Sequence, residues 1–403
     1  MTKLLDLKNN SVIAINQNNH TKEDNCKKVC YLDTDNITNN RINAFLKIDL
    51  TKEKLPSRAK RKCSLNSIIY SSVRPNQRHF GIIKEIPKNF LVSTAFIVID
   101  IIDLKKLDPN YLYYYITQDK ITHYLQRIAE CGTSSYPSIT PLDFLNIKIK
   151  LYPLETQQKI ARTLSVLDQK IENNHKINEL LHKILELLYE QYFVRFDFLD
   201  ENNKPYQTSG GKMKFSKELN RLIPSGWSVR FLNHKIVSTY QPKTISKTLL
   251  NDSYSYSVYG GGGIIGRFTE YNHEQSEFII SCRGQCGISY LTLPKSWITG
   301  NAMVIRPTKS YTSKTYLYHT IKKYKLTNYI TGSVQPQITR QNLSTMPILI
   351  PKRKILNKWN NISSLLWNLI HNNMQATQTL TALRDFLLPL LLKQQVKPKQ
   401  KIL

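Results

Sequence analysis

The residues best placed to do chemistry in this sequence are a run of glycines, Gly260 to Gly263, followed by Gly266. Glycine-rich loops hold phosphates when they open a helix that begins with Lys-Ser or Lys-Thr. No such pair follows here, and the next residues, IIGRF, predict a strand. The run is therefore interpreted as a tight turn or a close backbone approach rather than as a nucleotide site.

Other reactive signatures are missing from the sequence. It has no GxxxxGKS/T, HExxH or GxSxG motif and no Asn-Pro-Pro-aromatic tetrapeptide. The cysteines at positions 26, 30, 63, 131, 282 and 286 lack CxxC spacing, so they are interpreted as reduced thiols, with Cys282 and Cys286 left as the metal candidates. We expect no catalytic residue, metal or cofactor site on this chain.

The charge indicates a polyanionic partner. Lys and Arg number 57 against 29 Asp and Glu, a net charge of +28, and the pI is about 9.7. Neutralising phosphates is the common use of such a charge, although it does not by itself separate nucleic acid from a membrane surface. The rival explanation is a codon bias toward lysine, asparagine, isoleucine and tyrosine.

Hydrophobic patterning argues against a membrane protein. The N-terminus, MTKLLDLKNN, lacks the apolar centre of a signal peptide. The longest apolar stretch, FLLPLLL at 386–392, falls short of the ~20 residues that span a bilayer. We expect a cytoplasmic protein.

The chain repeats itself once. GTSSYPSIT at 132–140 resembles GSVQPQIT at 332–339, and pairing Pro137 with Pro336 gives an offset of 336 − 137 = 199 residues. The same offset pairs Leu167 with Leu366 and many later positions. Looser matches lie upstream, such as STAFIVI (93–99) with GNAMVIR (300–306) and YLYYYI (111–116) with YLYHTI (316–321). Each half is thus predicted to hold a variable, strand-rich domain, a Pro-x-Ile-Thr loop and a long helix.

Two long helices should follow the strand-rich domains. From Leu154 the apolar residues recur in steps of three and four, which is a heptad seam, and the segment after Pro351 repeats it. Asn174, Asn178 and Asn373 fall on the seam, where buried asparagines fix the helix register. Antiparallel pairing would match these polar layers; the alternative is that each helix folds back on its own domain.

Strands are predicted at 278–281 and 303–305, and short helices at the two YLY segments. The predicted fold class is α+β, with two mixed strand/helix domains, two long antiparallel coiled-coil helices and a pseudo-two-fold internal repeat. The predicted boundaries are domain 1 at 1–153, helix 1 at 154–198, a linker at 199–222, domain 2 at 223–351, helix 2 at 352–395 and a basic tail at 396–403.

Several motifs, in this order, carry a family resemblance. They are IPSGW (223–227), YSVYGGGGIIGRFTEYN (256–272), EFIISCRGQCG (277–287), WITGNAMVIRP (297–307), GSVQPQIT (332–339) and TQQKIARTLSVLDQKIENNHKINELL (156–181). Together they resemble the specificity subunit (S subunit, HsdS) of bacterial type I restriction-modification systems. The first domain lacks the IPxGW and YGGGG stretches, and the second helix shows KRKILNKWNNI in place of the Gln-Gln-Lys-Ile-Ala signature.

The resemblance implies a non-catalytic DNA-binding subunit. In this family two target recognition domains each read one half of a split DNA site, and the helices set the gap. The implied partners are double-stranded DNA, two modification subunits that bind S-adenosylmethionine and methylate adenine, and restriction subunits that use ATP and Mg²⁺. Those cofactors would be bound by the partners, and none by this chain.

The repeated loops supply the candidate DNA-binding residues, because Arg suits guanine and Asn or Gln suits adenine. Arg74, Asn76 and Arg78 are matched with Arg283 and Gln285, and Arg283 is the preferred candidate. Tyr259 to Gly262 are candidates for a close approach to the DNA backbone. A structural role, in a turn or a hydrogen bond, is the alternative for each candidate. The full set is Arg74, Asn76, Arg78, Ser134, Ser135, Tyr136, Tyr259, Gly260, Gly261, Gly262, Arg283, Gln285, Ser333, Gln335, Gln337 and Arg340.

An apolar patch on the helices is the candidate dock for the modification subunits, with core packing as the alternative. Its proposed members are Leu187, Tyr189, Phe193, Phe386 and Leu390. Three other functions remain open at this point: the recognition subunit of a type IIB system, a nuclease or methyltransferase acting alone, and a non-specific nucleic-acid scaffold built on a coiled coil.

Overall fold

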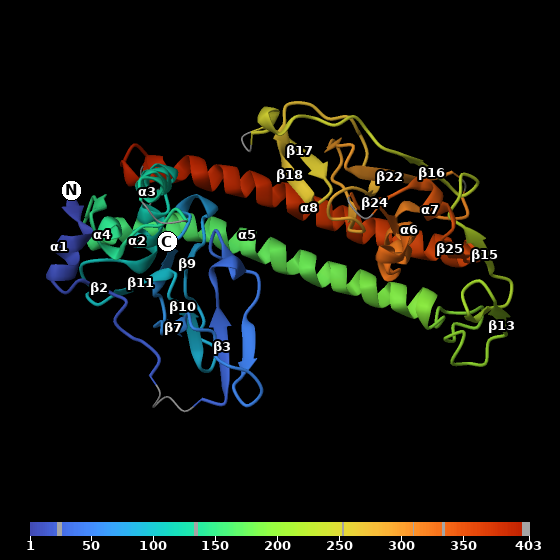
Figure 1. Ribbon diagram of the computed structural model, residues 1–403, viewed down its shortest axis with the longest axis horizontal. Coiled ribbons are helices and arrows are strands. Elements are labelled where there is room, and N and C mark those ends of the chain that lie inside the picture. Colours follow the sequence, from blue (N-terminus) through green and yellow to red (C-terminus); the bar gives the residue numbers. More distant parts are fainter. Residues whose placement is uncertain (22–25, 133–135, 252–253, 309, 333–334, 397–403) are drawn as a thin grey trace, which may run out of the picture. The chain divides into compact units, whose positions relative to one another are not determined.

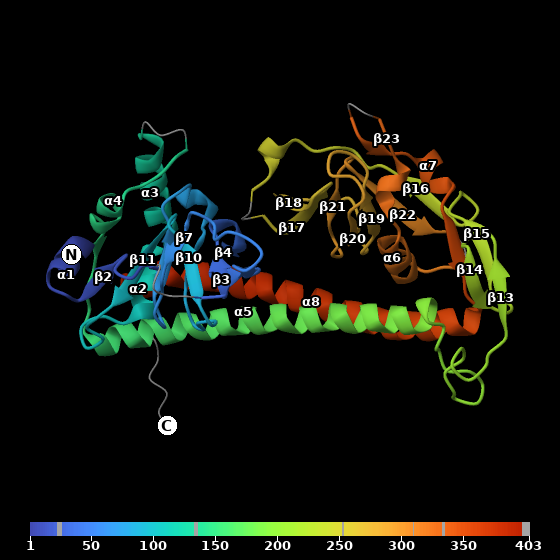
Figure 2. The ribbon, with the colours of Figure 1, turned by 60° about the horizontal axis from the view of Figure 1, so that its bottom comes forward.

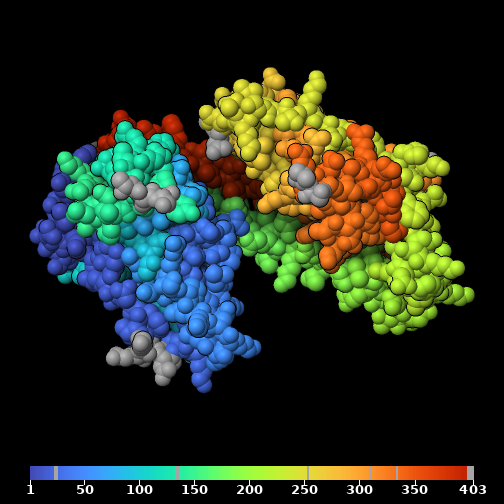
Figure 3. All heavy atoms as spheres, in the orientation of Figure 1, coloured from blue at the N-terminus to red at the C-terminus, as the bar shows by residue number. Residues whose placement is uncertain are grey.

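The structure, a computed structural model, divides the chain into two compact units (Figures 1 and 2). It describes residues 1–403 except 22–25, 133–135, 252–253, 309, 333–334 and 397–403. The first unit comprises Met1–Asn174 and Ala376–Leu403, and the second comprises His175–Gln375. In the space-filling view, the strand-rich domain of the first unit appears in blue to green and that of the second in yellow to orange (Figure 3).

Each unit contains a four-stranded antiparallel sheet with the same strand order. The order in the first unit is β2 (Ile13–Ile15), β11 (Phe96–Ile101), β8 (Ile68–Ser71) and β9 (Phe80–Ile82). The order in the second is β16 (Val237–Tyr240), β22 (Ala302–Pro307), β19 (Phe278–Ser281) and β20 (Ser289–Leu291). The internal repeat and the predicted strands at 278–281 and 303–305 are confirmed.

A second sheet in each unit is also related. In the first unit it is β6 (Leu46–Asp49), β3 (Lys28–Leu32), β10 (Phe90–Ser93) and β7 (Ala59–Arg61); in the second it is β18 (Gly263–Phe268), β17 (Tyr256–Gly260) and β21 (Trp297–Ile298). Both contain one parallel pair, β3 with β10 and β17 with β21. Gly260 pairs with Gly263 across the tight β17–β18 turn. The corresponding β3–β6 connection is longer and carries β4 (Ile37–Thr38) and β5 (Arg41–Ile42), so the first unit needs no glycine run.

Short strand pairs complete the units. β1 (Thr2–Lys3) pairs with β12 (Lys148–Ile149), and β15 (Ser228–Phe231) pairs with β25 (Pro347–Ile350). The second unit adds β23 (Ile330–Thr331) with β24 (Gln337–Ile338). The segment predicted as a linker, 199–222, differs from expectation, because it includes β13 (Met213–Ser216) and the start of its partner β14 (Arg221–Pro224).

Short helices pack beside the sheets. They are α1 (Leu4–Asn9), α2 (Pro109–Ile116), α3 (Asp119–Glu130), α4 (Pro141–Leu145), α6 (Lys314–Lys323) and α7 (Arg340–Ser344), and 3-10 turns lie at Thr34–Asn36, Pro75–Gln77, Lys247–Leu249 and Leu326–Tyr329. The helices predicted at the two YLY segments are α2 and α6. The threonine of each repeated Ile-Thr is an N-cap: Thr140 accepts a hydrogen bond from Asp143 N–H, and Thr339 from Asn342 N–H.

The long helices are α5 (Leu154–Tyr189), which continues as a π turn over Glu190–Val194, and α8 (Arg353–Leu392). They run antiparallel in each unit. In the first unit Asp168 contacts Arg384 and Asn174 contacts Thr377; in the second Asn178 contacts Asn373. One side of each helix is also part of its domain core, through residues such as Ile160 and Leu164 in the first unit and Leu185 and Ile370 in the second. The two helices therefore pair with each other and also pack on the domains.

Candidate nucleic-acid interface

Two loops of the second unit are joined around Arg283. The loop after β19 forms an isolated antiparallel bridge with the closing loop, between Arg283 and Gln337. Ile338 N–H donates to the Cys282 carbonyl over 3.0 Å, and the Cys286 thiol lies 3.2 Å from the Pro336 carbonyl oxygen. These backbone contacts hold the two polar loops as one surface.

The glycine turn between β17 and β18 fits beneath the same surface. A Cβ on Gly261 would lie 2.8 Å from the Arg283 carbonyl oxygen, closer than a side chain tolerates, and a Cβ on Gly262 would lie 3.8 Å from Gln285 Oε1. Gly261 is buried, whereas Gly262 is exposed. The glycine run therefore serves a close approach of two backbones within the protein, and Gly261 is required there because only hydrogen fits.

Four polar side chains of these joined loops are exposed: Arg283, Gln285, Gln335 and Gln337. Below them Cys282 is fully buried, and its thiol accepts a hydrogen bond from Gln241 Nε2 over 2.8 Å. Positive φ angles at Gly284 (75°) and Gly287 (92°) allow the loop to turn back into β20. A guanidinium flanked by amides on a fixed backbone provides the donors and acceptors that pair with base edges. We call these four residues the Arg283 surface.

The first unit has the same backbone bridge between the loop after a strand and the Pro-x-Ile-Thr loop, but the bridging residue is one position earlier than the sequence match suggested. Val73 bridges to Ser138, and Ile139 N–H donates to the Ser72 carbonyl over 2.8 Å. The structural counterpart of Arg283 is therefore Val73, and the sequence match of Arg74 with Arg283 is wrong by one residue. Arg74, with φ of 47°, instead takes the place of Gly284.

The first unit's loop is held by contacts with the protein itself, two through arginine side chains and one through the Asn76 backbone. The Arg74 guanidinium lies 5.3 Å from the centre of the exposed Tyr136 ring, a cation–π contact. Arg78 forms an ion pair of 2.9 Å with Asp119 at the start of α3. The Gln126 side chain, also on α3, accepts a hydrogen bond from Asn76 N–H over 3.1 Å. Sequence reasoning missed Asp119 and Gln126, because an amphipathic helix gives no signal for which polar residues contact a distant loop.

Other candidates lie elsewhere. The Tyr259 side chain is buried, and its hydroxyl accepts a hydrogen bond from Leu293 N–H; burial raises its pKa to about 12. It is a core residue, so its side chain is not available to contact DNA as the sequence suggested. Gly260 is also buried. Arg340 is exposed at the start of α7, beside a separate hollow lined by His234 and Ser238. Ser134, Ser135 and Ser333 lie outside the described residues.

Neither metal chemistry nor a membrane span is found in the part of the chain that the structure describes. There, no three His, Cys, Asp or Glu side chains are grouped to hold a metal ion. Burial raises the pKa of both Cys282 and Cys286, which disfavours the thiolate that a metal needs. Among the described helices, none is long and apolar enough to cross a membrane.

Comparison with known proteins places the chain in a family. The family described as type I restriction modification DNA specificity domain (Methylase_S) matches residues 6–183 and 224–380. These two matches cover most of the chain, which therefore belongs to this family and carries two such domains.

Individual relatives agree with the family match. The HindI type I restriction enzyme specificity subunit of Haemophilus influenzae is 23% identical, over 91% of this chain and 94% of its own. The MjaIX type I restriction enzyme specificity subunit of Methanocaldococcus jannaschii is 24% identical, over 70% of this chain and 67% of its own. The fold is similar to that of a type I restriction-modification S subunit from M. genitalium, with a TM-score of 0.55, 17% identity and full coverage of both chains.

Proposed function

We propose that this chain is the DNA-reading subunit of a type I restriction-modification complex and that each unit reads one half of a split site. One observation carries the proposal: the same bridge between a strand end and a Pro-x-Ile-Thr loop is built twice, once in each unit. Two copies of a reading surface in one chain suit a target with two halves. The separation of the halves would be set by the α5–α8 pair.

Recognition would proceed in two stages. The net charge of +28 first provides salt-dependent attraction to phosphates that does not depend on sequence. Side chains of the Arg283 surface would then read base edges, with the guanidinium suited to a guanine and the amides of Gln285 and Gln337 suited to adenines. The fixed backbone beneath them limits the entropy lost on binding.

We further propose that catalysis belongs to partner subunits in the cytoplasm of a bacterial cell. Modification subunits would bind S-adenosylmethionine and methylate adenine, and restriction subunits would bind ATP and Mg²⁺. This chain would bind none of these cofactors. Its contribution would be the choice of site and a platform for the modification subunits.

The exposed apolar side chains of the long helices support such a platform. In the second unit, each exposed apolar residue of α5 and α8 comes one residue before a position of the heptad seam. The exposed apolar residues of the two helices therefore lie on the same side of the antiparallel pair. They are Ile177, Leu180, Ile184 and Leu187 on α5 and Ile362, Leu365 and Leu369 on α8. Exposed apolar stripes of this kind mark protein interfaces.

The patch expected from the sequence is corrected in part by the structure. Leu187 and Phe386 are exposed, as a docking surface requires. Tyr189 and Phe193 are core residues of the second unit, only 5% and 3% exposed, and Leu390 is half-buried. The two aromatic side chains therefore hold the domain on the helices and are not available to a partner.

Co-expression with a modification subunit, followed by mapping of methylated adenines across a genome, tests the proposal. The expected result is one motif of two short sequences separated by a fixed gap. The modification subunit alone, which should methylate no such motif, is the control. Methylation spread over unrelated sequences, or binding of the complex that falls with salt equally for all sequences, would contradict the proposal.

A further inference from the structure

The polar layers between α5 and α8 fix how the helices align but do not choose the partner. In the first unit Asn174 Nδ2 donates to Thr377 Oγ1 over 3.2 Å; in the second Asn373 Nδ2 donates to Asn178 Oδ1 over 3.0 Å. The repeat offset of 199 residues converts the first pair into the second, since Asn174 corresponds to Asn373 and Asn178 to Thr377. Helix α5 of a second copy would therefore meet α5 with Asn174 against Asn178, and this layer would also be satisfied.

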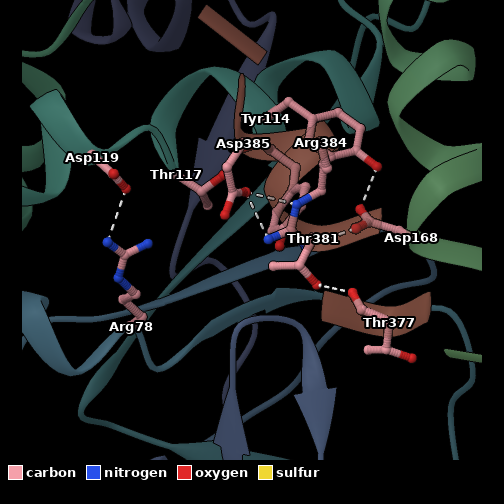
Figure 4. A network of polar contacts seen from close by, with 10 residues as sticks. Arg78, Tyr114, Thr117, Asp119, Asp168, Thr377, Thr381, Arg384 and Asp385 are labelled. Atoms are coloured by element: carbon pink, nitrogen blue, oxygen red, sulfur yellow. Dashed lines mark hydrogen bonds and ion pairs between the residues drawn. The ribbon is translucent and has the colours of Figure 1, made fainter. Parts of the chain in front are cut away.

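A charged network in the first unit lacks this symmetry (Figure 4). Arg384 Nη1 on α8 donates to Asp168 Oδ1 on α5 over 2.9 Å, and the Tyr114 hydroxyl on α2 donates to Asp168 Oδ2 over 2.5 Å. The Arg384 and Asp168 side chains are only 21% and 20% exposed. Arg384 also binds Asp385, at 2.8 Å from Nη2. One carboxylate thus connects the strand-rich domain to both long helices.

The repeat places apolar residues at the corresponding positions. Counting 199 residues back from Arg384 gives Leu185, and 199 residues on from Asp168 gives Trp367. Both are buried in the second unit. If α5 paired with α5 of a second copy in the equivalent register, each Asp168 would face Leu185. If α8 paired with α8, each Arg384 would face Trp367. The largely buried Asp168 carboxylate would then have no cation beside it, which is strongly unfavourable, whereas Arg384 would keep Asp385 of its own helix.

We propose that the Asp168–Arg384 ion pair, anchored by Tyr114, selects the partner of α5. The ion pair favours pairing of α5 with α8 of its own chain and disfavours pairing of α5 with α5 of another copy. The order of synthesis creates the need for such a device. Helix α5 ends at Tyr189 and α8 begins only at Arg353, so a nascent chain presents an apolar seam before its proper partner exists. During that interval the matching surface is α5 of a neighbouring chain, and an unpaired charge is the means of rejecting it.

The test uses the full chain carrying two different tags, co-expressed and purified through one tag. The variant Asp168→Leu with Arg384→Leu removes the charge on both helices. We expect roughly tenfold more of the second tag to co-purify than with the wild type, as the penalty for like-with-like pairing disappears. Light scattering after size-exclusion chromatography should show the corresponding dimer.

The matched control is Asn174→Leu with Thr377→Leu, which also replaces a polar layer by leucine but leaves Asp168 opposite Leu185. It should co-purify no more of the second tag than the wild type. A second variant, Asp168→Trp with Arg384→Leu, copies the Trp367 and Leu185 pair of the second unit and should behave like the double leucine variant. Thermal unfolding checks that the variants are folded. Arg384→Leu alone should lower the midpoint, because it leaves Asp168 buried without its cation, and the double variant should recover it.

The inference is overturned if both charge-free variants stay as monomeric as the wild type, or if the Asn174 and Thr377 control dimerises equally. None of these measurements involves DNA, so their outcome is independent of the proposed DNA-reading function.

Discussion

The two units attach their strand-rich domains to the long helices with different chemistry. In the first unit the contact is the Tyr114, Asp168 and Arg384 network. In the second unit His319 takes the place of Tyr114 and Trp367 that of Asp168. There His319 lies 5.3 Å from Trp359 and 5.6 Å from Tyr189, measured between ring centres.

The difference shows that one backbone arrangement can serve two purposes. Aromatic packing buries a large apolar area and provides stability without regard to partner. The ion pair provides selectivity, because pairing with a helix that lacks the opposite charge would leave a buried charge without its counter-ion. Its own contribution to stability is expected to be small, because desolvation offsets the attraction between the charges. The repeat thus carries different residues at the position where the two halves must be distinguished.

The aromatic junction has a weakness of its own. Within the described residues the Nε2 atoms of His319 and His371 and the Nε1 atoms of Trp359 and Trp367 are buried without a hydrogen-bond partner. Each such group lowers stability by the cost of removing it from water. The second unit thus depends on apolar burial to offset unsatisfied polar atoms, whereas the polar groups of the first unit's network are paired.

The largest expected effect is on the stability of the second unit, when part of the buried aromatic junction is removed. Trp359→Ala removes a side chain that is 1% exposed, and the cavity should lower the free energy of unfolding by about 3–5 kcal/mol. All four tryptophans, at 227, 297, 359 and 367, lie in the second unit, so tryptophan fluorescence during urea unfolding reports this unit alone. Leu222→Ala, at a side chain that is 54% exposed, is the control. Equal shifts for the two variants would show that the aromatic junction carries little of the stability.

A smaller effect should appear on acidification. Burial, with nearby lysines, lowers the pKa of His319 to about 3 and that of His371 to about 4. The unfolded chain takes up protons near pH 6.5 while the folded unit does not, so stability falls as the pH drops from about 6.5 toward these folded values. The slope should not exceed about 1.4 kcal/mol per pH unit for each histidine.

The first unit lacks this pH response at its corresponding position, because burial and the Asp168 charge raise the pKa of Tyr114, which stays neutral. Unfolding midpoints from tryptophan fluorescence between pH 7.5 and 5.5 measure the slope. His319→Phe should reduce it, and His371, His182 and His273, whose pKa values are also lowered, supply the remainder. An unchanged slope in that variant would place the acid sensitivity elsewhere.

Much of the architecture could be predicted from the sequence because it rests on periodicity and repetition. The heptad spacing predicted the helix pair, and the 199-residue offset predicted the duplicated topology. The partners of the loops could not be predicted in the same way. Val73 rather than Arg74 corresponds to Arg283 because the two loops differ in length, and backbone bridges are not visible in residue types. Tyr259 was misassigned for a similar reason, since a tyrosine beside glycines does not reveal on which side of the strand it lies.

The most direct test of one reading surface in each unit is adenine methylation mapping of the complex that contains Arg283→Ala. Arg74→Ala, at the exposed arginine that follows Val73 in the first unit, is the comparison variant. Both side chains are exposed, so neither change should alter folding. Loss of one Arg contact to a base should reduce discrimination at that position by about 1–3 kcal/mol. We predict that Arg283→Ala relaxes one half of the split motif and leaves the other half and the gap intact. Equal relaxation of both halves, or an unchanged motif, would contradict the assignment of one reading surface to each unit.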